Sequence, residues 1–293
     1  MSIPIFALKS RFKTVLKTLP LLVVFAALQS ARGETLSGPV GLQLESVSGA
    51  LKQNMSATLG RVHNFGFKYV ELVGDYNLSP GALTAELRAH DLVAVSAHFP
   101  YARFRDDPEG VAREGAALGL KYAGCPSLPQ HEALDENGCR DAIAVFNRAG
   151  EALAKQGITF FYHPHGYEFK PHGDGTFFDQ LMAETKPEFV HFQMDIFWIV
   201  HAGQDPVKLL QKYGNRWVSM HLKDMKKGTP TGRFNGHADK AAFVPLGRGQ
   251  IDLPAAFHEA NKIGIQWYFI EDESAHPEAQ IPLSLNYLRV VKW

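Results

Sequence analysis

The stretch that decides the fold runs from Ile158 to Asp224. It reads ITFFYHPHGYEF at 158–169, VHFQMDIFW at 190–198 and AGQDPVKLLQKYGNRWVSMHLKD at 202–224. Each segment contains a short apolar run of β-type residues that ends in histidines and carboxylates, and a fourth run at 266–270 repeats this pattern. Ligands and catalytic groups collect at the carboxyl ends of the strands of a parallel sheet. The pattern therefore predicts a site built from several strand ends.

The side chains that follow these four runs include one candidate metal ligand from each. They are Glu168, Asp195, His221 and Glu271. Three carboxylates and an imidazole, without a thiolate, suit Mn²⁺, Mg²⁺, Co²⁺ or Zn²⁺. Without a cation, three neighbouring carboxylates would repel one another and raise their pKa values. We therefore predict one bound divalent metal ion; a hydrogen-bonded polar mouth without metal is the alternative.

Strands and helices alternate over the rest of the chain after Gly33. The predicted strands lie at 40–44, 68–73, 92–97, 121–125, 158–162, 190–194, 217–220 and 266–270. The helices that follow them are predicted at about 49–64, 80–90, 107–118, 136–155, 177–184, 206–213, 253–263 and 281–291. Eight such units predict an α/β fold, a single-domain (β/α)8 barrel over residues 34–293. A doubly wound open sheet competes, but the Gly-rich turn GxGxxG that it would bring is absent after the first two strands.

The first 33 residues have the pattern of a signal peptide. All five of their charged residues are basic, an apolar run follows at 19–28, and Ala31-Arg32-Gly33 offers a small-x-small cleavage site. The apolar run is short for a transmembrane span, so an uncleaved anchor is the weaker alternative. We expect export to a bacterial periplasm, with no membrane attachment after cleavage.

The charge balance argues against nucleic acid as a partner. The chain carries 30 basic and 30 acidic residues, and removal of the first 33 residues leaves 25 basic against 30 acidic ones. A mildly acidic body without a basic stripe is unfavourable for binding nucleic acid. Two cysteines, Cys125 and Cys139, permit a disulfide without implying one. The pattern gives no indication of the oligomeric state.

Three histidines near strand ends are candidates for contact with a substrate. His163 and His165 are two residues apart, so a strict strand would point both to the same side. One is then a candidate metal ligand and the other a candidate substrate contact or base, while a neutral core imidazole is the structural alternative. His98 ends the third predicted strand and is a further candidate substrate contact.

Two more residues complete the predicted site. Lys223 shares a side with His221 in strand alternation, so it is a candidate for stabilising a developing oxyanion. A surface pair with Asp224 is the alternative for this lysine. Trp198 is a candidate for an apolar wall on which a sugar stacks, although an aromatic residue at such a position is as often part of the core.

At these residues the chain resembles the superfamily of sugar phosphate isomerases and epimerases, the xylose isomerase-like TIM barrels. The matching motifs are GLQL at 41–44, GFKYVE at 66–71, YHPHGYEF at 162–169, Asp195 and Trp198 with AGQDP at 202–206, HLKD at 221–224 and GRGQID at 247–252. They cover essentially the whole mature chain. The resemblance implies a TIM barrel that binds one divalent metal ion through Glu168, Asp195, His221 and Glu271.

The chain departs from the family pattern at three positions. His163 stands where many relatives have a glutamate at the end of the fifth strand, so either His163 or Glu168 completes the metal shell. Glu45 stands where relatives often have an aromatic residue, which makes it a candidate contact in an altered sugar pocket. Pro164 replaces the usual asparagine.

The resemblance also implies a reaction. In related isomerases and epimerases the metal polarises a ketose carbonyl, a carboxylate removes the neighbouring proton, and the metal stabilises the enediolate. On this chain Glu168 and Glu271 are the candidate acids and bases as well as ligands, with His165 orienting the substrate and Lys223 assisting. We therefore expect an exported isomerase or epimerase that acts on a small sugar or keto-sugar.

Other functions stay open. A dehydratase or keto-glycoside lyase would use the same site but eliminate a β-substituent after the proton is removed. A metal-dependent endonuclease of the same superfamily would need a cationic groove, which the acidic body disfavours. A non-catalytic periplasmic sugar-binding barrel would keep the aromatic residues and need no metal.

Overall fold

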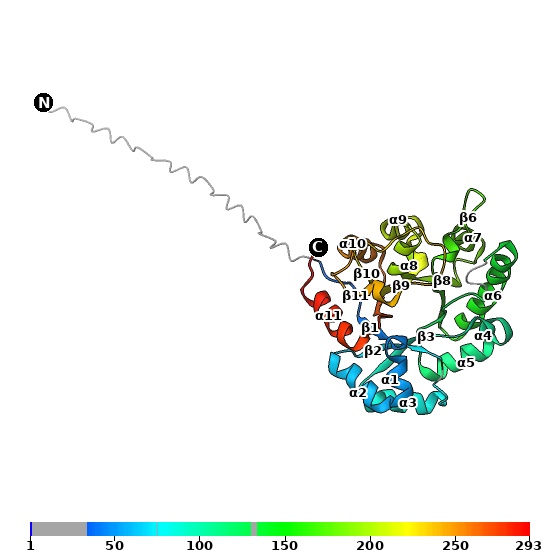
Figure 1. The fold of residues 1–293 in the computed structure, drawn as a ribbon, viewed down its shortest axis with the longest axis horizontal. Helices are drawn as coiled ribbons and strands as arrows, with labels where there is room; N and C mark the ends of the chain where they lie inside the picture. Colours follow the sequence, from blue (N-terminus) through cyan, green and yellow to red (C-terminus); the bar gives the residue numbers. More distant parts are fainter. Residues whose placement is uncertain (2–33, 75, 130–133) are drawn as a thin grey trace. The chain divides into compact units, whose positions relative to one another are not determined.

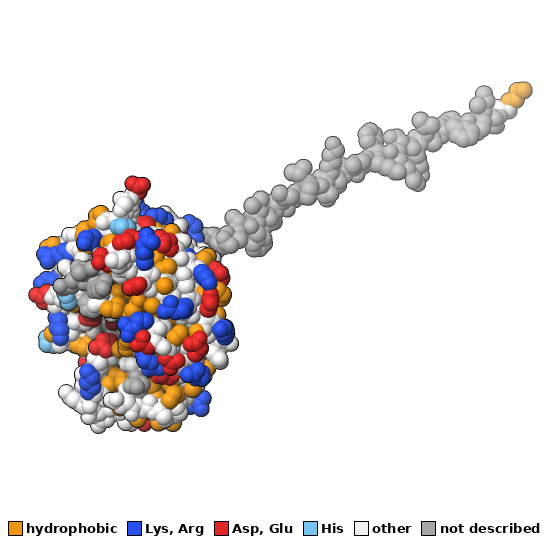
Figure 2. Space-filling model, turned by 90° about the vertical axis from the view of Figure 1, so that its right-hand side faces the viewer, with side chains coloured by type: hydrophobic (Ala, Val, Ile, Leu, Met, Phe, Trp, Pro, Cys, Tyr) orange, Lys and Arg blue, Asp and Glu red, His pale blue; other side chains and the backbone are white. Residues whose placement is uncertain are grey.

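The computed structural model describes Met1 and residues 34–74, 76–129 and 134–293. The predicted signal peptide at 1–33 lies outside these residues apart from Met1, so it stays a prediction. None of the helices in the described part of the chain has the length and apolar content of a membrane span. On the face shown in Figure 2, acidic and basic side chains are interspersed.

Eight parallel strands close into a barrel, and the helices lie around it (Figure 1). In order around the barrel the strands are β1 (Val40–Gln43), β12 (Trp267–Ile270), β9 (Trp217–Leu222), β8 (Val190–Asp195), β5 (Thr159–Tyr162), β4 (Tyr122–Cys125), β3 (Val93–His98) and β2 (Tyr69–Val73). β2 pairs with β1 and so closes the ring. The predicted (β/α)8 barrel is confirmed.

Eleven helices in the described residues accompany the strands. They are α1 (Ser48–Gln53), α2 (Met55–Phe65), α3 (Pro80–Ala89), α4 (Tyr101–Asp106), α5 (Pro108–Leu118), α6 (Glu136–Ala154), α7 (Phe177–Glu184), α8 (Ile196–His201), α9 (Pro206–Tyr213), α10 (Leu253–Ile263) and α11 (Pro277–Val290). Short elements complete the chain: η1 (Leu44–Val47), η2 (Tyr167–Phe169), η3 (Gly214–Arg216), η4 (Lys240–Ala242), and the two-residue strands β6 (Pro171–His172), β7 (Gly175–Thr176), β10 (Asp224–Met225) and β11 (Phe243–Val244).

The helices differ from the prediction at three places. α8 follows β8 directly and α4 begins three residues after the last residue of β3, at two places where no helix is predicted. The single helix predicted at 49–64 is two helices, because Asn54 leaves the helical conformation with φ −157° and ψ 98°. The Asn54 side chain then accepts a hydrogen bond from Ala57 N at 2.9 Å and caps α2.

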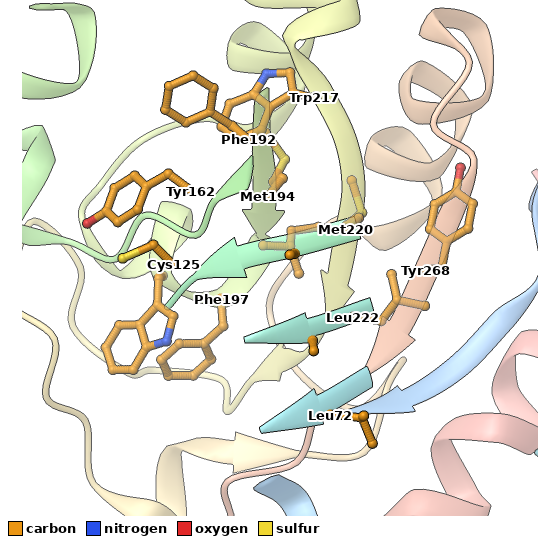
Figure 3. Close-up of a cluster of buried hydrophobic side chains, with 14 of the residues drawn as sticks. Leu72, Cys125, Tyr162, Phe192, Met194, Phe197, Trp217, Met220, Leu222 and Tyr268 are labelled. Atoms are coloured by element: carbon orange, nitrogen blue, oxygen red, sulfur yellow. The ribbon is translucent and has the colours of Figure 1, made fainter. Parts of the chain in front are cut away.

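The main core lies between the strands and the helices. Figure 3 shows outward-facing strand residues in this layer, among them Leu72, Met194, Met220, Leu222 and Tyr268. Each of these side chains is fully buried. A barrel strand is covered on both faces, so apolar residues can occupy both faces of one strand, as in β12 (WYFI) and most of β2 (YVELV).

The barrel interior changes from apolar to polar along the strand direction. Val95, Tyr122, Phe161, Trp267 and Phe269 form a small separate apolar cluster inside the barrel. Further along the strands, the inward positions are occupied by buried polar side chains, including Gln43, Glu71, His98, Gln193, Asp195 and His221. Because inward positions alternate by two, Phe269 in β12 leads to Glu271 at the barrel mouth.

Candidate metal centre at the barrel mouth

Four side chains from neighbouring strand ends converge at the mouth. His163 follows β5, Asp195 ends β8, His221 lies in β9 and Glu271 follows β12, and each offers one nitrogen or oxygen atom within 4.8 Å of the others. Asp195 and His221 are register partners in the paired strands. All four side chains are buried or nearly so. The structure thus brings together three of the four predicted ligands, with His163 in the fourth position.

The spacing of these atoms suits a small divalent cation. His163 Nε2 lies 3.6 Å and His221 Nδ1 lies 3.8 Å from Asp195 Oδ2, and His221 Nδ1 is 2.8 Å from Glu271 Oε2. Ligand atoms at bond lengths of about 2.0–2.2 Å around one ion lie roughly 3–3.5 Å apart. The four groups would therefore need only small adjustments to hold an ion. Two imidazoles and two carboxylates favour Zn²⁺, Mn²⁺ or Co²⁺ over Mg²⁺.

Lys223 lies inside the same cluster. Its Nζ is 2.8 Å from Asp195 Oδ2 and 2.6 Å from Glu271 Oε2, and it also pairs with Glu273. Burial opposes the charge on Lys223, but these carboxylates raise its pKa well above the usual value. Burial likewise opposes ionisation of Asp195 and Glu271, yet Lys223 lowers the pKa of both carboxyl groups. The mouth is therefore a group of charged side chains that neutralise one another.

The alternative for Lys223 was a surface pair with Asp224, but Asp224 has other partners. Its carboxylate instead accepts backbone hydrogen bonds from Gly247 at 2.9 Å and Gly249 at 2.8 Å, and also from Met225 and Ile251. A Cβ at Gly249 would lie 2.1 Å from Asp224 Oδ1, so the close approach requires glycine. The HLKD and GRGQID motifs are thus joined at Asp224, which anchors the chain after β9.

Glu168 lies apart from the other predicted ligands. β5 ends at Tyr162, whose ring points outward and packs 4.8 Å from Phe146 of α6. The Tyr162 hydroxyl donates to Glu168 Oε1, and His165 N donates to Glu168 Oε2 at 3.0 Å. The turn after His163 therefore carries Glu168 to the helix side of the strand. Burial raises the pKa of this carboxyl group to about 8, so at neutral pH it is mostly protonated and a poor metal ligand.

His165 and Trp198, from the predicted substrate contacts, lie beside the mouth. Their rings are 5.2 Å apart, and the His165 ring is 5.0 Å from that of His163. Among the described residues neither His165 Nδ1 nor Trp198 Nε1 has a hydrogen-bond partner, although both atoms are buried. Burial lowers the pKa of His165 to about 4, so its imidazole is neutral at pH 7.

The loop after β10 covers this side of the mouth. A Cβ at Gly166 would lie 2.4 Å from the carbonyl oxygen of Asn235, so the loop and the His165 turn are in close contact. A Cβ at Gly236 would lie 3.6 Å from the nearest atom of the His165 ring, at ordinary van der Waals distance. The same loop and His201 line a cavity of about 580 Å³.

The other two predicted substrate contacts have different positions. His98 lies inside the barrel, with its Nε2 3.0 Å from Gln193 Oε1 and 3.3 Å from Glu71 Oε1. Glu45, in contrast, is exposed on η1 and accepts a hydrogen bond from Ser48 Oγ at 3.1 Å. The structure does not bring Glu45 into the mouth, because the chain turns outward after Gln43.

Three polar residues of the site were not predicted: Glu71, Gln193 and Glu273. Glu71 lies in the middle of β2 and Gln193 in the middle of β8, and both are fully buried. A carboxylate or an amide within an otherwise apolar strand is the signal that could have found them. Glu273 follows Glu271 by two residues, a spacing that could have indicated a second carboxylate at the mouth.

The fold and site define a (β/α)8 barrel with a candidate metal centre at its carboxyl end. Residues 59–291 match the family described as xylose isomerase-like TIM barrel, and the chain belongs to this family. A solved structure named as a sugar phosphate isomerase/epimerase from Parabacteroides distasonis ATCC 8503 is similar, with a TM-score of 0.72 and 26% identity, covering 87% of this chain and 95% of that one. A structure of the IolI protein with a bound zinc atom has the same fold, with a TM-score of 0.65 and 16% identity over 84% of this chain and 95% of that one.

Curated relatives carry the name inosose dehydratase. The protein from Clostridium tetani (strain Massachusetts / E88) is 27% identical over 239 residues, which cover 71% of this chain and 78% of the relative. The protein from Geobacillus thermodenitrificans (strain NG80-2) is 28% identical over 147 residues. The match covers 48% of this chain and 48% of the relative, so it spans about half of the relative's length.

Proposed function

We propose that this chain is an exported, divalent-metal-dependent enzyme that removes a proton next to the carbonyl group of a keto-sugar, ending in isomerisation or epimerisation. The observation that carries the proposal is the convergence of His163, Asp195, His221 and Glu271 around Lys223. A divalent ion held by the two imidazoles and two carboxylates would polarise a carbonyl oxygen of the substrate. The zinc atom in the IolI protein supports a metal centre in this fold. The signal-like pattern at 1–33 supports export.

The residues around the centre would divide the remaining tasks. Lys223 would offset negative charge that develops on the carbonyl oxygen. Glu271 is held ionised by Lys223 and His221, so it is the candidate to accept the proton. His165 Nδ1 would accept a hydrogen bond from a sugar hydroxyl, and the Trp198 indole N–H would donate one. Glu168 takes no part in proton transfer here, because it lies on the helix side of β5.

Dehydration of a keto-sugar or keto-cyclitol is the second candidate function. It starts with the same proton removal and continues with loss of a hydroxyl group from the next carbon, so the residues above would serve it equally. The observation that favours it is the match to two inosose dehydratases at 27% and 28% identity. A small neutral substrate also suits a mature chain with 25 basic against 30 acidic residues better than nucleic acid does.

Metal content is the first test. The mature protein, purified without added metal, should contain about one divalent ion per chain by elemental analysis. The double variant Asp195→Asn/His221→Ala should contain almost none. The variant Glu168→Gln is the matched control and should keep the ion, because its side chain lies outside the cluster. A wild-type protein that takes up no metal even after incubation with Mn²⁺ or Zn²⁺ would refute the metal-dependent reaction.

The outcome of the reaction needs a second experiment. Candidate keto-sugars and keto-cyclitols are incubated with the metal-loaded protein in deuterated water and followed by NMR and mass spectrometry. Uptake of one deuteron by a substrate that loses no water or other leaving group supports isomerisation or epimerisation. Loss of water supports dehydration. If no substrate exchanges a proton although metal is bound, a sugar-binding role replaces both.

A further inference from the structure

A buried carboxylate and a buried amide lie directly beneath the candidate metal centre. Glu71 Oε1 is 2.5 Å from His221 Nε2, and Glu71 Oε2 accepts hydrogen bonds from Ser96 Oγ at 2.6 Å and from Gln193 Nε2 at 2.9 Å. The Gln193 Oε1 atom lies 3.0 Å from His98 Nε2 and 2.9 Å from His163 Nδ1. All six of these side chains are buried. The two imidazoles of the candidate metal centre therefore each contact one member of the Glu71–Gln193 pair.

The hydrogens in this network can be assigned from its chemistry. A carboxylate only accepts, so the Gln193 nitrogen must face Glu71 and the Gln193 oxygen must face the imidazoles. The imidazole nitrogens that face this oxygen, His98 Nε2 and His163 Nδ1, must then both carry hydrogen. For His163 this leaves the lone pair on Nε2, which is the atom that lies 3.6 Å from Asp195 Oδ2.

The same reasoning applies to His221. Its Nε2 faces Glu71, while its Nδ1 faces Glu271 at 2.8 Å and Asp195 at 3.8 Å. When Nδ1 serves as a ligand, the single remaining hydrogen is on Nε2 and is held by the Glu71 carboxylate. A hydrogen bond from the second nitrogen of a ligating histidine to a carboxylate orients the ring and raises its basicity.

We infer that Glu71 and Gln193 are positioning residues that fix the tautomer and orientation of both imidazole ligands, His221 through Glu71 and His163 through Gln193. The inference rests on the proposed metal-dependent function. The pair links ligands from two strands, because Glu71 comes from β2 and Gln193 from β8. One buried hydrogen bond between them therefore couples the orientation of the two rings.

Metal affinity of two variants tests the inference. Glu71→Met and Gln193→Met each roughly keep side-chain volume but remove the oxygen acceptor that one imidazole needs, so we expect the Kd for Zn²⁺ to rise about 10–100-fold in each. The matched control is Ser96→Ala, which removes a contact to the same Glu71 oxygen but touches neither imidazole ligand. Its Kd should stay within about threefold of the wild type. Affinity is measured by competition with a chelating dye, and circular dichroism verifies that each variant is folded.

The hydrogen positions are read directly by ¹⁵N NMR of the imidazole rings, which needs no activity and no variant. The metal-free protein should carry the His163 hydrogen on Nδ1, and the Zn²⁺-loaded protein should carry the His221 hydrogen on Nε2. Hydrogen on the opposite nitrogen of either ring, or wild-type affinity in both folded variants, overturns the inference. A wild-type protein that binds no divalent ion overturns the proposed function instead, and the His163 spectrum of the metal-free protein still decides the role of Gln193.

Discussion

Two groups of buried carboxylates on opposite sides of the strand layer behave in opposite ways. The first group, the mouth cluster, consists of Asp195, His221, Lys223 and Glu271 inside the barrel. The second group, the phenol cluster, consists of Glu168, Tyr162 and Tyr167 on the helix side of β5. Burial raises the pKa of Glu168 to about 8, whereas Lys223 lowers the pKa of Asp195 and Glu271 although burial opposes their ionisation as well.

The comparison shows which buried carboxylates can bind a cation. Burial alone favours the neutral acid, and a fixed ammonium group or imidazolium reverses that preference. The mouth carboxylates stay ionised because a cationic side chain is built into the cluster, so an incoming metal ion meets groups that have already lost their protons. Within the described part of the chain, the partners of Glu168 are neutral phenols and backbone N–H groups.

Removal of the buried lysine should have the largest effect. Lys223→Met removes the ammonium group shared by Asp195 and Glu271 and leaves these buried carboxylates with His221 as their remaining cationic partner, so the unfolding free energy of the metal-free protein should fall by about 3–5 kcal/mol. Zn²⁺ should restore more stability to the variant than to the wild type, because the ammonium group no longer competes for the same oxygens. Urea denaturation with a chelator or with Zn²⁺ measures both effects.

The exposed Lys227→Met is the matched control for this prediction. A surface lysine in the loop that follows β10 should change the unfolding free energy by less than about 0.5 kcal/mol. If Lys223→Met were as stable as this control in the presence of a chelator, the mouth carboxylates would not depend on the lysine for their charge. The distinction between the two clusters would then fail.

The mouth cluster could be predicted from the sequence more fully than the phenol cluster. Asp195, His221 and Glu271 each follow a clear β-type run closely, so their positions are set by barrel geometry. Glu168 comes five residues after His163, beyond a proline and a glycine. Strand alternation no longer applies over such a turn, and the local pattern does not specify on which side of β5 the carboxylate will lie.

The positioning residues were missed for a different reason. In β2 every residue except Glu71 is apolar or aromatic, so no alternation marks Glu71 as inward. In β8, Gln193 alternates with apolar residues and shares a side with Asp195, but this pattern does not show what the amide contacts. The separate roles of Glu71 and Gln193 depend on the contact between β2 and β8 across the barrel interior. A single sequence contains no signal for a contact between strands that are not neighbours. The fold could therefore be predicted as a whole, but the layer beneath the metal centre could not.

The pH dependence of stability should separate the two clusters next. Between pH 4.5, the ordinary pKa of a glutamate, and about 8, the folded chain holds a proton on Glu168 that the unfolded chain has released. The wild-type unfolding free energy should therefore lose a contribution as pH rises through this window, on the order of a few kcal/mol in total. Glu168→Gln has no such proton, so its stability relative to the wild type should increase with pH.

Urea denaturation at several pH values measures this difference. The exposed Glu188→Gln is the control and should run parallel to the wild type across the window. A constant gap between Glu168→Gln and the wild type from pH 5 to 8 would mean that Glu168 is ionised throughout. The phenol cluster would then resemble the mouth cluster in its charge.

Removal of one phenol should have the smallest effect. Tyr162→Phe deletes the hydroxyl group that donates to Glu168, at a cost of about 1–2 kcal/mol in unfolding free energy. That hydrogen bond lowers the pKa of Glu168, so its loss should move the pH window of the previous prediction upward. Tyr101→Phe is the matched control, because the Tyr101 ring also packs against Phe146, at 6.2 Å, and lies outside the cluster. If both variants shifted the window equally, the effect would come from packing, and the phenol would not set the proton affinity of Glu168.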